Sequence, residues 1–178
     1  MEMSPARPFS LDSRRRGRGW LRLGSARFPG DNGFFAAHVV LPIVVGATIY
    51  VLWRSTALRV FTWLALGGLA APVARLRELA APLGSALPDW FLYSLPDGLW
   101  VYAVMSFMAR VWREDARRRR VLWIAAGPLL GVGWEMAQRA GIAPGTFDGV
   151  DLLWYAVATA AASCLHRPWA ARPARVGA

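Results

Sequence analysis

Three acidic residues lie on three different apolar segments. Each is separated by nearly the same number of residues from an arginine at the other end of its segment. The acids are Asp97, Glu135 and Asp151, and the arginines, which are 16, 15 and 16 residues away, are Arg113, Arg120 and Arg167. At a helical rise of about 1.5 Å per residue, these separations correspond to roughly 23 Å. Ionisable groups inside a membrane span are rare, costly and usually functional. We therefore interpret the three carboxyl groups as a candidate site at one depth, near the outer boundary of a bilayer.

Chain connectivity adds two polar residues to this candidate site. Glu135 and Gln138 are three residues apart, so they project from similar faces of one helix. Gly131 and Gly133 precede them by one turn or less and permit close approach of a neighbouring helix or a ligand. The following stretch, residues 140–151, is short and rich in Gly and Pro, which is typical of a turn. The predicted ligand-binding residues are therefore Asp97, Glu135, Gln138, Asp148 and Asp151.

Helix capping is an alternative role for some of these acids. Ser94 reads as the N-cap of a helix that has Asp97 in its first turn, where the helix dipole favours an acid by about 0.3–1 kcal/mol. Asp148 reads as a second N-cap, with Asp151 three residues later. Glu135 differs, because it lies near a helix C-terminus and needs compensation there. Compensation can come from protonation, a bound cation or one arginine among Arg75, Arg77 and Arg139.

The apolar residues form long blocks that predict a membrane protein. The chain has 178 residues, of which 56% are hydrophobic, and ten are Trp. Four segments are near the length of a spanning helix: Phe34–Trp53, Asp97–Trp112, Val121–Gln138 and Asp151–Leu165. A fifth segment, Ala57–Val73, is broken at Gly67 and Gly68 and closed by Pro72. The predicted fold is an all-α polytopic membrane helix bundle with four spanning helices and, from the fifth segment, a re-entrant or interfacial helix on the outer side. A five-span arrangement, in which this segment crosses the membrane, is the alternative.

The distribution of arginine predicts the orientation of this bundle. All 21 basic residues are Arg, and the net charge is +10. The arginines cluster before the first span, between the second and third spans, and after the last span, so that all three clusters fall on one side. We therefore predict cytoplasmic termini and no nucleic-acid partner, since no DNA-binding motif accompanies the charge. The predicted organisation is a disordered Arg-rich cytoplasmic tail at 1–32, a membrane domain at 33–168 and a short cytoplasmic tail at 169–178.

The remaining candidate ligands for a metal or cofactor are few. Cys164 is the one cysteine, which excludes a disulfide within the chain. His38 falls toward the cytoplasmic end of its span, remote from the acids, and is predicted to be a packing or interfacial histidine. We predict no metal site and no cofactor.

The acidic motifs resemble those of a known family. Glu135-Met-Ala-Gln138, followed by a turn and Asp148-Gly-Val-Asp151, resembles the E-x-x-Q…D-x-x-D pattern of the VanZ-like family of small bacterial membrane proteins. The segment at 95–102, with Asp97 heading a helix, resembles that family's earlier acidic helix start. The chain departs from the pattern in lacking an Arg in the turn and in having Tyr155 where relatives often have Asn. The resemblance implies a multi-pass protein of the bacterial inner membrane, with a namesake linked to lowered susceptibility to teicoplanin-type antibiotics.

These observations favour one function and leave two alternatives open. The favoured function is binding of a polar lipid headgroup, lipid-linked envelope precursor or amphiphile at an outer-leaflet carboxylate pocket roofed by residues 57–96. The first alternative is a membrane enzyme acting on a lipid-linked substrate, in which a carboxyl group acts as general acid or base. The second is a scaffold that binds another membrane protein, with acids that only cap helices. An ion pathway is disfavoured, because the acids stay at one depth.

Overall fold

The computed structural model describes residues 31–166, which form helices joined by turns and short loops and contain no β-strand, and this confirms the all-α prediction. The elements are α1 (Asp31–Phe35), the π-helical turn η1 (Ala36–Val40), α2 (Leu41–Trp53), α3 (Arg59–Leu66), α4 (Ala70–Gly84), α5 (Asp89–Tyr93), α6 (Leu95–Val111), α7 (Arg117–Arg139) and α8 (Gly149–His166). Apart from residues 31 and 32, which begin α1, the predicted tails at 1–32 and 169–178 lie outside the described residues.

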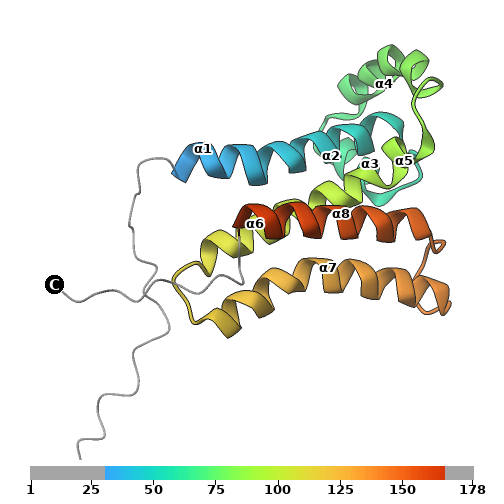
Figure 1. Ribbon diagram of the computed structural model, residues 1–178. Helices are drawn as coiled ribbons and strands as arrows, with labels where there is room; N and C mark the ends of the chain where they lie inside the picture. Colours follow the sequence, from blue (N-terminus) through green and yellow to red (C-terminus); the bar gives the residue numbers. More distant parts are fainter. Residues whose placement is uncertain (1–30, 167–178) are drawn as a thin grey trace, which may run out of the picture.

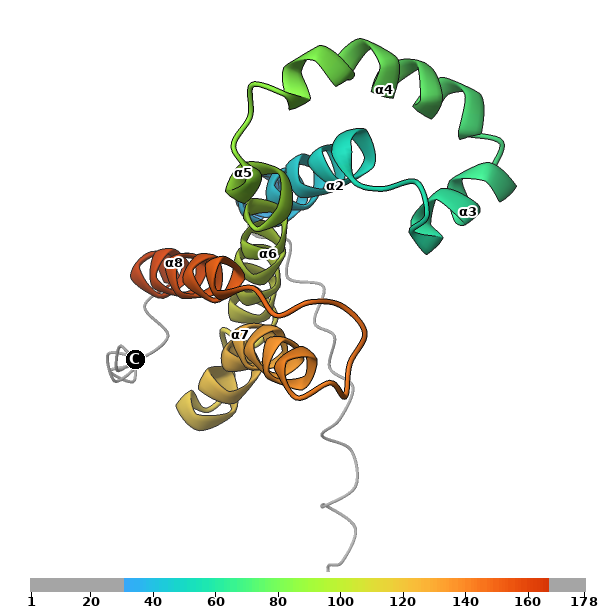
Figure 2. The ribbon, with the colours of Figure 1, turned by 90° about the vertical axis from the view of Figure 1, so that its right-hand side faces the viewer.

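Helix α6 is the centre of a bundle of long helices. The continuous helix from α1 to α2 runs alongside α6, and α7 and α8 complete the bundle (Figure 1). Helix α6 packs against α2, α7 and α8, and Figure 2 shows it between them. The central core consists of Val101, Met105, Ile124, Tyr155, Ala158 and Ala162. Residues at the beginning of α6 can therefore contact several neighbouring helices.

The two ends of the bundle carry different charges. The start of α1, the connection between α6 and α7, and the end of α8 lie together, and the described basic run Arg117–Arg120 is at this "arginine end" (Figure 1). The opposite "acid end" holds α3, α4, α5 and the loop between α7 and α8. Asp97, Glu135 and Asp151 lie at the acid end. The predicted N-terminal and C-terminal arginine clusters lie outside the described residues.

Among the described helices, one segment is long and apolar enough to cross a membrane by length and composition, namely residues 32–53. Helix α6 has 17 residues, α7 begins with four arginines, and α8 includes an acid and a histidine. The count of four spanning helices is therefore not supported by this criterion. Large apolar side chains nevertheless face outward on these helices, including Leu129 and Leu130 on α7 and Leu153 on α8.

The first long helix contains one widened turn, and His38 lies in it. The Leu41 N–H donates to the carbonyl of Ala36, five residues earlier, where an α-helix would use the residue four earlier. Pro42 explains the position of the widening, because it has no N–H for the His38 carbonyl and its ring crowds that carbonyl. The apolar pattern of residues 34–53 predicts a regular helix, and the widened turn is a departure from it.

The predicted outer helix at Ala57–Val73 is wrong in its boundaries. The structure has two helices here, α3 and α4, separated at Gly67–Leu69, and Gly68 has a φ of 74°, which favours glycine. Pro72 lies in the first turn of α4, where a missing N–H breaks no helical hydrogen bond. Pro72 therefore begins a helix instead of closing one. Together α3 and α4 form an arc around the end of α2 (Figure 2).

The Arg77 side chain links the arc of α3 and α4 to the C-terminal end of α2. Its guanidinium donates hydrogen bonds to the carbonyl of Val51 and, at 2.9 Å, to that of Arg54, both at the C-terminal end of α2. The same guanidinium lies 5.0 Å from the ring centroid of Phe61. Carbonyls at the end of a helix lack helical donors, so a cation placed there stabilises the helix end.

Replacing Arg77 with glutamine is expected to lower the free energy of unfolding by about 1–2 kcal/mol, because two charged hydrogen bonds to main-chain carbonyls are lost or weakened. Chemical unfolding in detergent micelles measures this change. Arg75→Gln, two residues away on an exposed part of α4, is the control and should change stability by less than about 0.5 kcal/mol. Equal effects of the two substitutions would contradict the role of Arg77.

Candidate functional site

The structure brings four of the five predicted residues into one acidic layer. Asp97 lies in the first turn of α6, Glu135 near the end of α7, and Asp151 in the first turn of α8. The Asp97 carboxylate repels those of Asp151 and Glu135, and Glu135 is also repelled by Asp148. We call these four residues the acid layer. Their proximity agrees with the prediction from depth and connectivity.

Glu135 is compensated by a main-chain donor. Its side chain is 3% exposed, and its Oε2 accepts a hydrogen bond of 3.1 Å from the N–H of Asp148. Of the three forms of compensation considered from the sequence, the arginine partner is not found, since no ion pair among the described residues joins Glu135 to Arg75, Arg77 or Arg139. Arg139 instead lies 5.1 Å from the ring centroid of Phe147. The hydrogen bond closes the α7–α8 loop onto α7.

Asp148 has the capping role that the sequence suggested. Its Oδ1 accepts a hydrogen bond of 2.8 Å from the N–H of Val150, in the first turn of α8. This hydrogen bond satisfies a main-chain N–H that has no acceptor within the helix. The acidic residue at position 148 is therefore explained without a ligand.

Asp151 is not explained by capping. Its Oδ1 is buried and has no hydrogen-bond partner, while its carboxylate interacts with the hydroxyl of Ser94. Ser94 occupies the predicted N-cap position of α6 but makes no capping hydrogen bond with its side chain. Buried polar atoms without a partner are uncommon in folded proteins, and each calls for an explanation. The Asp151 oxygen is therefore available to a donor from outside the described residues.

Gln138 stabilises a turn and does not join the acid layer through any described contact. Its Nε2 donates a hydrogen bond of 3.1 Å to the carbonyl of Pro144. Gly145 follows with a φ of 119°, and a Cβ at this position would collide with the Gln138 amide. The glycine is therefore required both by the backbone conformation and by the glutamine.

Arg54 is a charged member of the site that the sequence analysis missed. Its Nη2 lies 3.9 Å from the Oδ2 of Asp97 and 3.2 Å from the carbonyl of Tyr93. Its guanidinium also lies 5.4 Å and 4.8 Å from the ring centroids of Tyr50 and Tyr93. A signal was present in the sequence, because Arg54 directly follows the first predicted span at its outer end, where the positive-inside rule expects few arginines.

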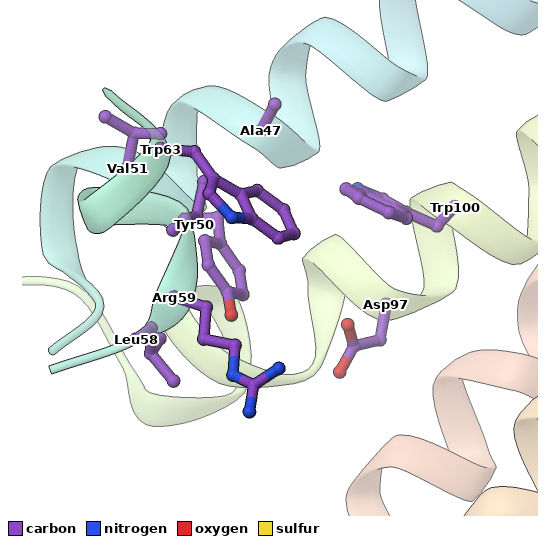
Figure 3. A pocket seen from close by; sticks show the side chains of 9 residues that line it. Ala47, Tyr50, Val51, Leu58, Arg59, Trp63, Asp97 and Trp100 are labelled. Atoms are coloured by element: carbon purple, nitrogen blue, oxygen red, sulfur yellow. The ribbon is translucent and has the colours of Figure 1, made fainter. Parts of the chain in front are cut away.

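A cavity of about 600 Å³ opens beside Asp97, between α2, α3 and α6. Its lining residues are Ala47, Tyr50, Val51, Leu58, Arg59, Val60, Trp63, Asp97 and Trp100. Figure 3 shows the Arg59 guanidinium, which extends from α3, and the Asp97 carboxylate, which extends from α6, near each other at one edge of the cavity, with the indoles of Trp63 and Trp100 on the same two helices. The lining is therefore mostly apolar, with one acid and one arginine.

Asp97 connects this cavity with the acid layer. A smaller cavity of about 240 Å³ lies on another side of α6, and Asp97 and Trp100 line both cavities. Tyr155, which is 6% exposed, lines the smaller cavity and interacts electrostatically with Asp97, Asp151 and Glu135. Its ring packs on Gly131, where a Cβ would lie 3.1 Å from Tyr155 Cε2, so the predicted close approach of a neighbouring helix is confirmed at this glycine. It is wrong at Gly133, where no described heavy atom lies within 4 Å of the position of a Cβ.

The arginine end contains a separate polar cluster around two histidines. His38 Nδ1 lies 2.7 Å from the hydroxyl of Tyr102, and His166 Nε2 lies 2.9 Å from that of Ser106. The two imidazole centroids are 6.4 Å apart, and Phe34 contacts both rings. His38 is thus a satisfied packing histidine, as predicted, whereas its proximity to His166 was missed.

No group of three or more His, Cys, Asp or Glu side chains within residues 31–166 is arranged to hold a metal ion. The chain matches no protein-family model, no curated protein and no solved structure at a significant level. The resemblance to the VanZ-like family therefore depends on the motif residues alone and stays a prediction, as do the ligand-binding roles of the acid layer.

Proposed function

We propose that this chain is a VanZ-like protein of the bacterial inner membrane that binds the polar headgroup of a lipid, a lipid-linked envelope precursor or another amphiphile. The headgroup enters the cavity beside Asp97, and the apolar chain follows the apolar wall of the same cavity. The observation that carries the proposal is that Asp97 belongs to the acid layer and also lines a mostly apolar cavity of about 600 Å³. Cavities of this size and character are typical of small-molecule sites.

Outward-facing apolar side chains support the membrane part of the proposal. Leu41 on α2, Leu130 on α7 and Leu153 on α8 are 56%, 75% and 61% exposed, respectively. Exposing apolar surfaces of this kind to water is unfavourable, whereas contact between them and lipid chains is favourable. In this proposal the long helices span the bilayer, α3 and α4 lie at its outer interface, and the arginine end faces the cytoplasm with both termini.

The contacts of the acids argue against the scaffold alternative, in which these side chains only cap helices. Asp148 caps α8, but Asp97 pairs with Arg54 and Asp151 has a buried unpaired oxygen. Carboxylates accept hydrogen bonds, so headgroups with hydroxyl or amine groups fit Asp97 best.

The proposal predicts that Trp63→Ala weakens binding of monoglucosyl diacylglycerol, a lipid with hydroxyl groups and no phosphate, about fivefold. Trp63 is 67% exposed and its side chain forms part of the wall of the cavity. It lies on α3, a helix with no buried residue, so the fold should tolerate this change. Native mass spectrometry of the purified protein in detergent measures the retained lipid. Trp123→Ala, at an exposed position near the arginine end, is the control. Equal losses in the two variants, or no binding of either this glycolipid or phosphatidic acid by the unchanged protein, would refute the proposal.

A further inference from the structure

Arg59 is a charged side chain whose role the carboxylate site does not explain. It is the first residue of α3, it is exposed, and it lines the larger cavity. Among the described residues it has no hydrogen bond or ion pair. Although Figure 3 shows it near Asp97 at one edge of the cavity, the two groups form no ion pair. An exposed arginine that lines a mostly apolar cavity and has no protein partner is free to bind a ligand group that accepts hydrogen bonds.

The balance of donors and acceptors around the cavity supports the same conclusion. The Arg59 guanidinium, which is part of the lining, has five N–H donors. Asp97 is the one carboxylate in the lining, and Arg54 already lies 3.9 Å from it. Donors therefore exceed acceptors on the α3 side. A phosphate group has several acceptor oxygens and a negative charge, and it matches the planar fork of a guanidinium.

We propose that Arg59 binds the phosphate of the amphiphile in this cavity, so that the ligand is a phosphate-bearing lipid. The phosphate lies on the α3 side, hydroxyl or amine groups of the headgroup reach Asp97, and the lipid chain contacts the apolar lining that includes Val51, Val60 and Trp63. This inference rests on the proposed function, since it assigns the chemical class of the ligand at the same cavity. A phospholipid and a polyprenyl phosphate share this chemistry.

Paired lipids test the role of the phosphate. Dioleoyl phosphatidic acid is compared with dioleoyl glycerol, and undecaprenyl phosphate with undecaprenol, by native mass spectrometry of the full chain. The unchanged protein is expected to prefer the phosphorylated member of at least one pair about tenfold or more, and the pair with the larger preference identifies the chain type. Arg59→Gln should reduce this preference to less than about twofold. Arg59→Lys should retain part of the preference for the phosphorylated lipid, because the positive charge remains while the bidentate hydrogen bonding of the guanidinium is lost.

Arg75→Gln, which removes the same charge from exposed α4 outside the cavity, is the matched control and should leave the preference unchanged. Monoglucosyl diacylglycerol separates the two proposals. If the unchanged protein binds this phosphate-free lipid but shows no phosphate preference, or if Arg59→Gln retains the preference, the phosphate assignment is wrong while the proposed function stands. If the protein binds none of these lipids, the proposed function itself is wrong.

Discussion

Asp97→Asn is expected to weaken binding of monoglucosyl diacylglycerol at least tenfold. The carboxylate lines the larger cavity and is the member of the acid layer that can meet a headgroup there. Asparagine has nearly the same shape, but it replaces charge-assisted hydrogen bonds, worth about 1.5–3 kcal/mol, with neutral ones. A loss of about 1.4 kcal/mol is tenfold in affinity. Titration of the lipid against the purified variant in detergent measures the change.

Asp97→Asn should have the opposite effect on the affinity for phosphatidic acid, which it should raise. Neutralising Asp97 removes a negative charge from the cavity and releases Arg54 from its 3.9 Å ion pair, so a phosphate should bind more tightly. Asp148→Asn is the matched control, because it removes one charge from the acid layer while asparagine caps a helix as well as aspartate does. A glycolipid affinity that is unchanged in Asp97→Asn, or equally reduced in Asp148→Asn, would contradict the role assigned to Asp97.

Gly98→Leu is expected to lower the free energy of unfolding by about 3 kcal/mol, the largest stability effect that we predict. A Cβ at Gly98 would lie 3.1 Å from Trp154 Cβ and 3.2 Å from the Trp154 carbonyl oxygen, so main-chain atoms of α8 stand in the way. Overpacking a tight interface costs about 1–3 kcal/mol or more. Relief would require α6 and α8, the most extensively packed helix pair, to separate.

Gly133→Leu is the control for this prediction. Gly133 is also inside a helix, but no heavy atom lies within 4 Å of the position of its Cβ, and the residue is exposed. Leucine has a higher helix propensity than glycine, so this variant should be as stable as the original protein or more stable by up to about 1 kcal/mol. Thermal and chemical unfolding in the same detergent compare the two variants. Similar stabilities would show that α6 and α8 do not pack as the structure describes.

The sequence predicted the helices and the meeting of Glu135 with Asp148 because both depend on local information. The turn at 140–151 obliges α7 and α8 to run antiparallel, and it therefore places Asp148 near Glu135 whatever the rest of the packing. Asp148 as an N-cap was likewise readable from its position before an apolar helix. The observed ends of the long helices lie within a few residues of the predicted ones, apart from the longer start of α7.

Long-range partners could not be read from the sequence. Arg54 meets Asp97 across 43 positions of the chain, and nothing local to either residue specifies the other. Ser94 has the pattern of a cap, yet its hydroxyl interacts with Asp151 because α8 packs against the start of α6. Pro72 was misread because the same residue both ends helices and occupies their first turns. The membrane spans, the family and the ligand remain predictions.

Helix α3 differs from the rest of the fold in how weakly it is held. It buries none of its residues, packs mainly on α4, and is followed by Gly67 and Gly68. Segments with few buried contacts move at low free-energy cost. Since α3 carries both Arg59 and Trp63, the α3 side of the cavity should be displaced more easily than the α6 side with Asp97, because α6 packs against α2, α7 and α8. The protein should therefore be strict about headgroup contacts with α6 and tolerant of the thickness and branching of the attached hydrocarbon.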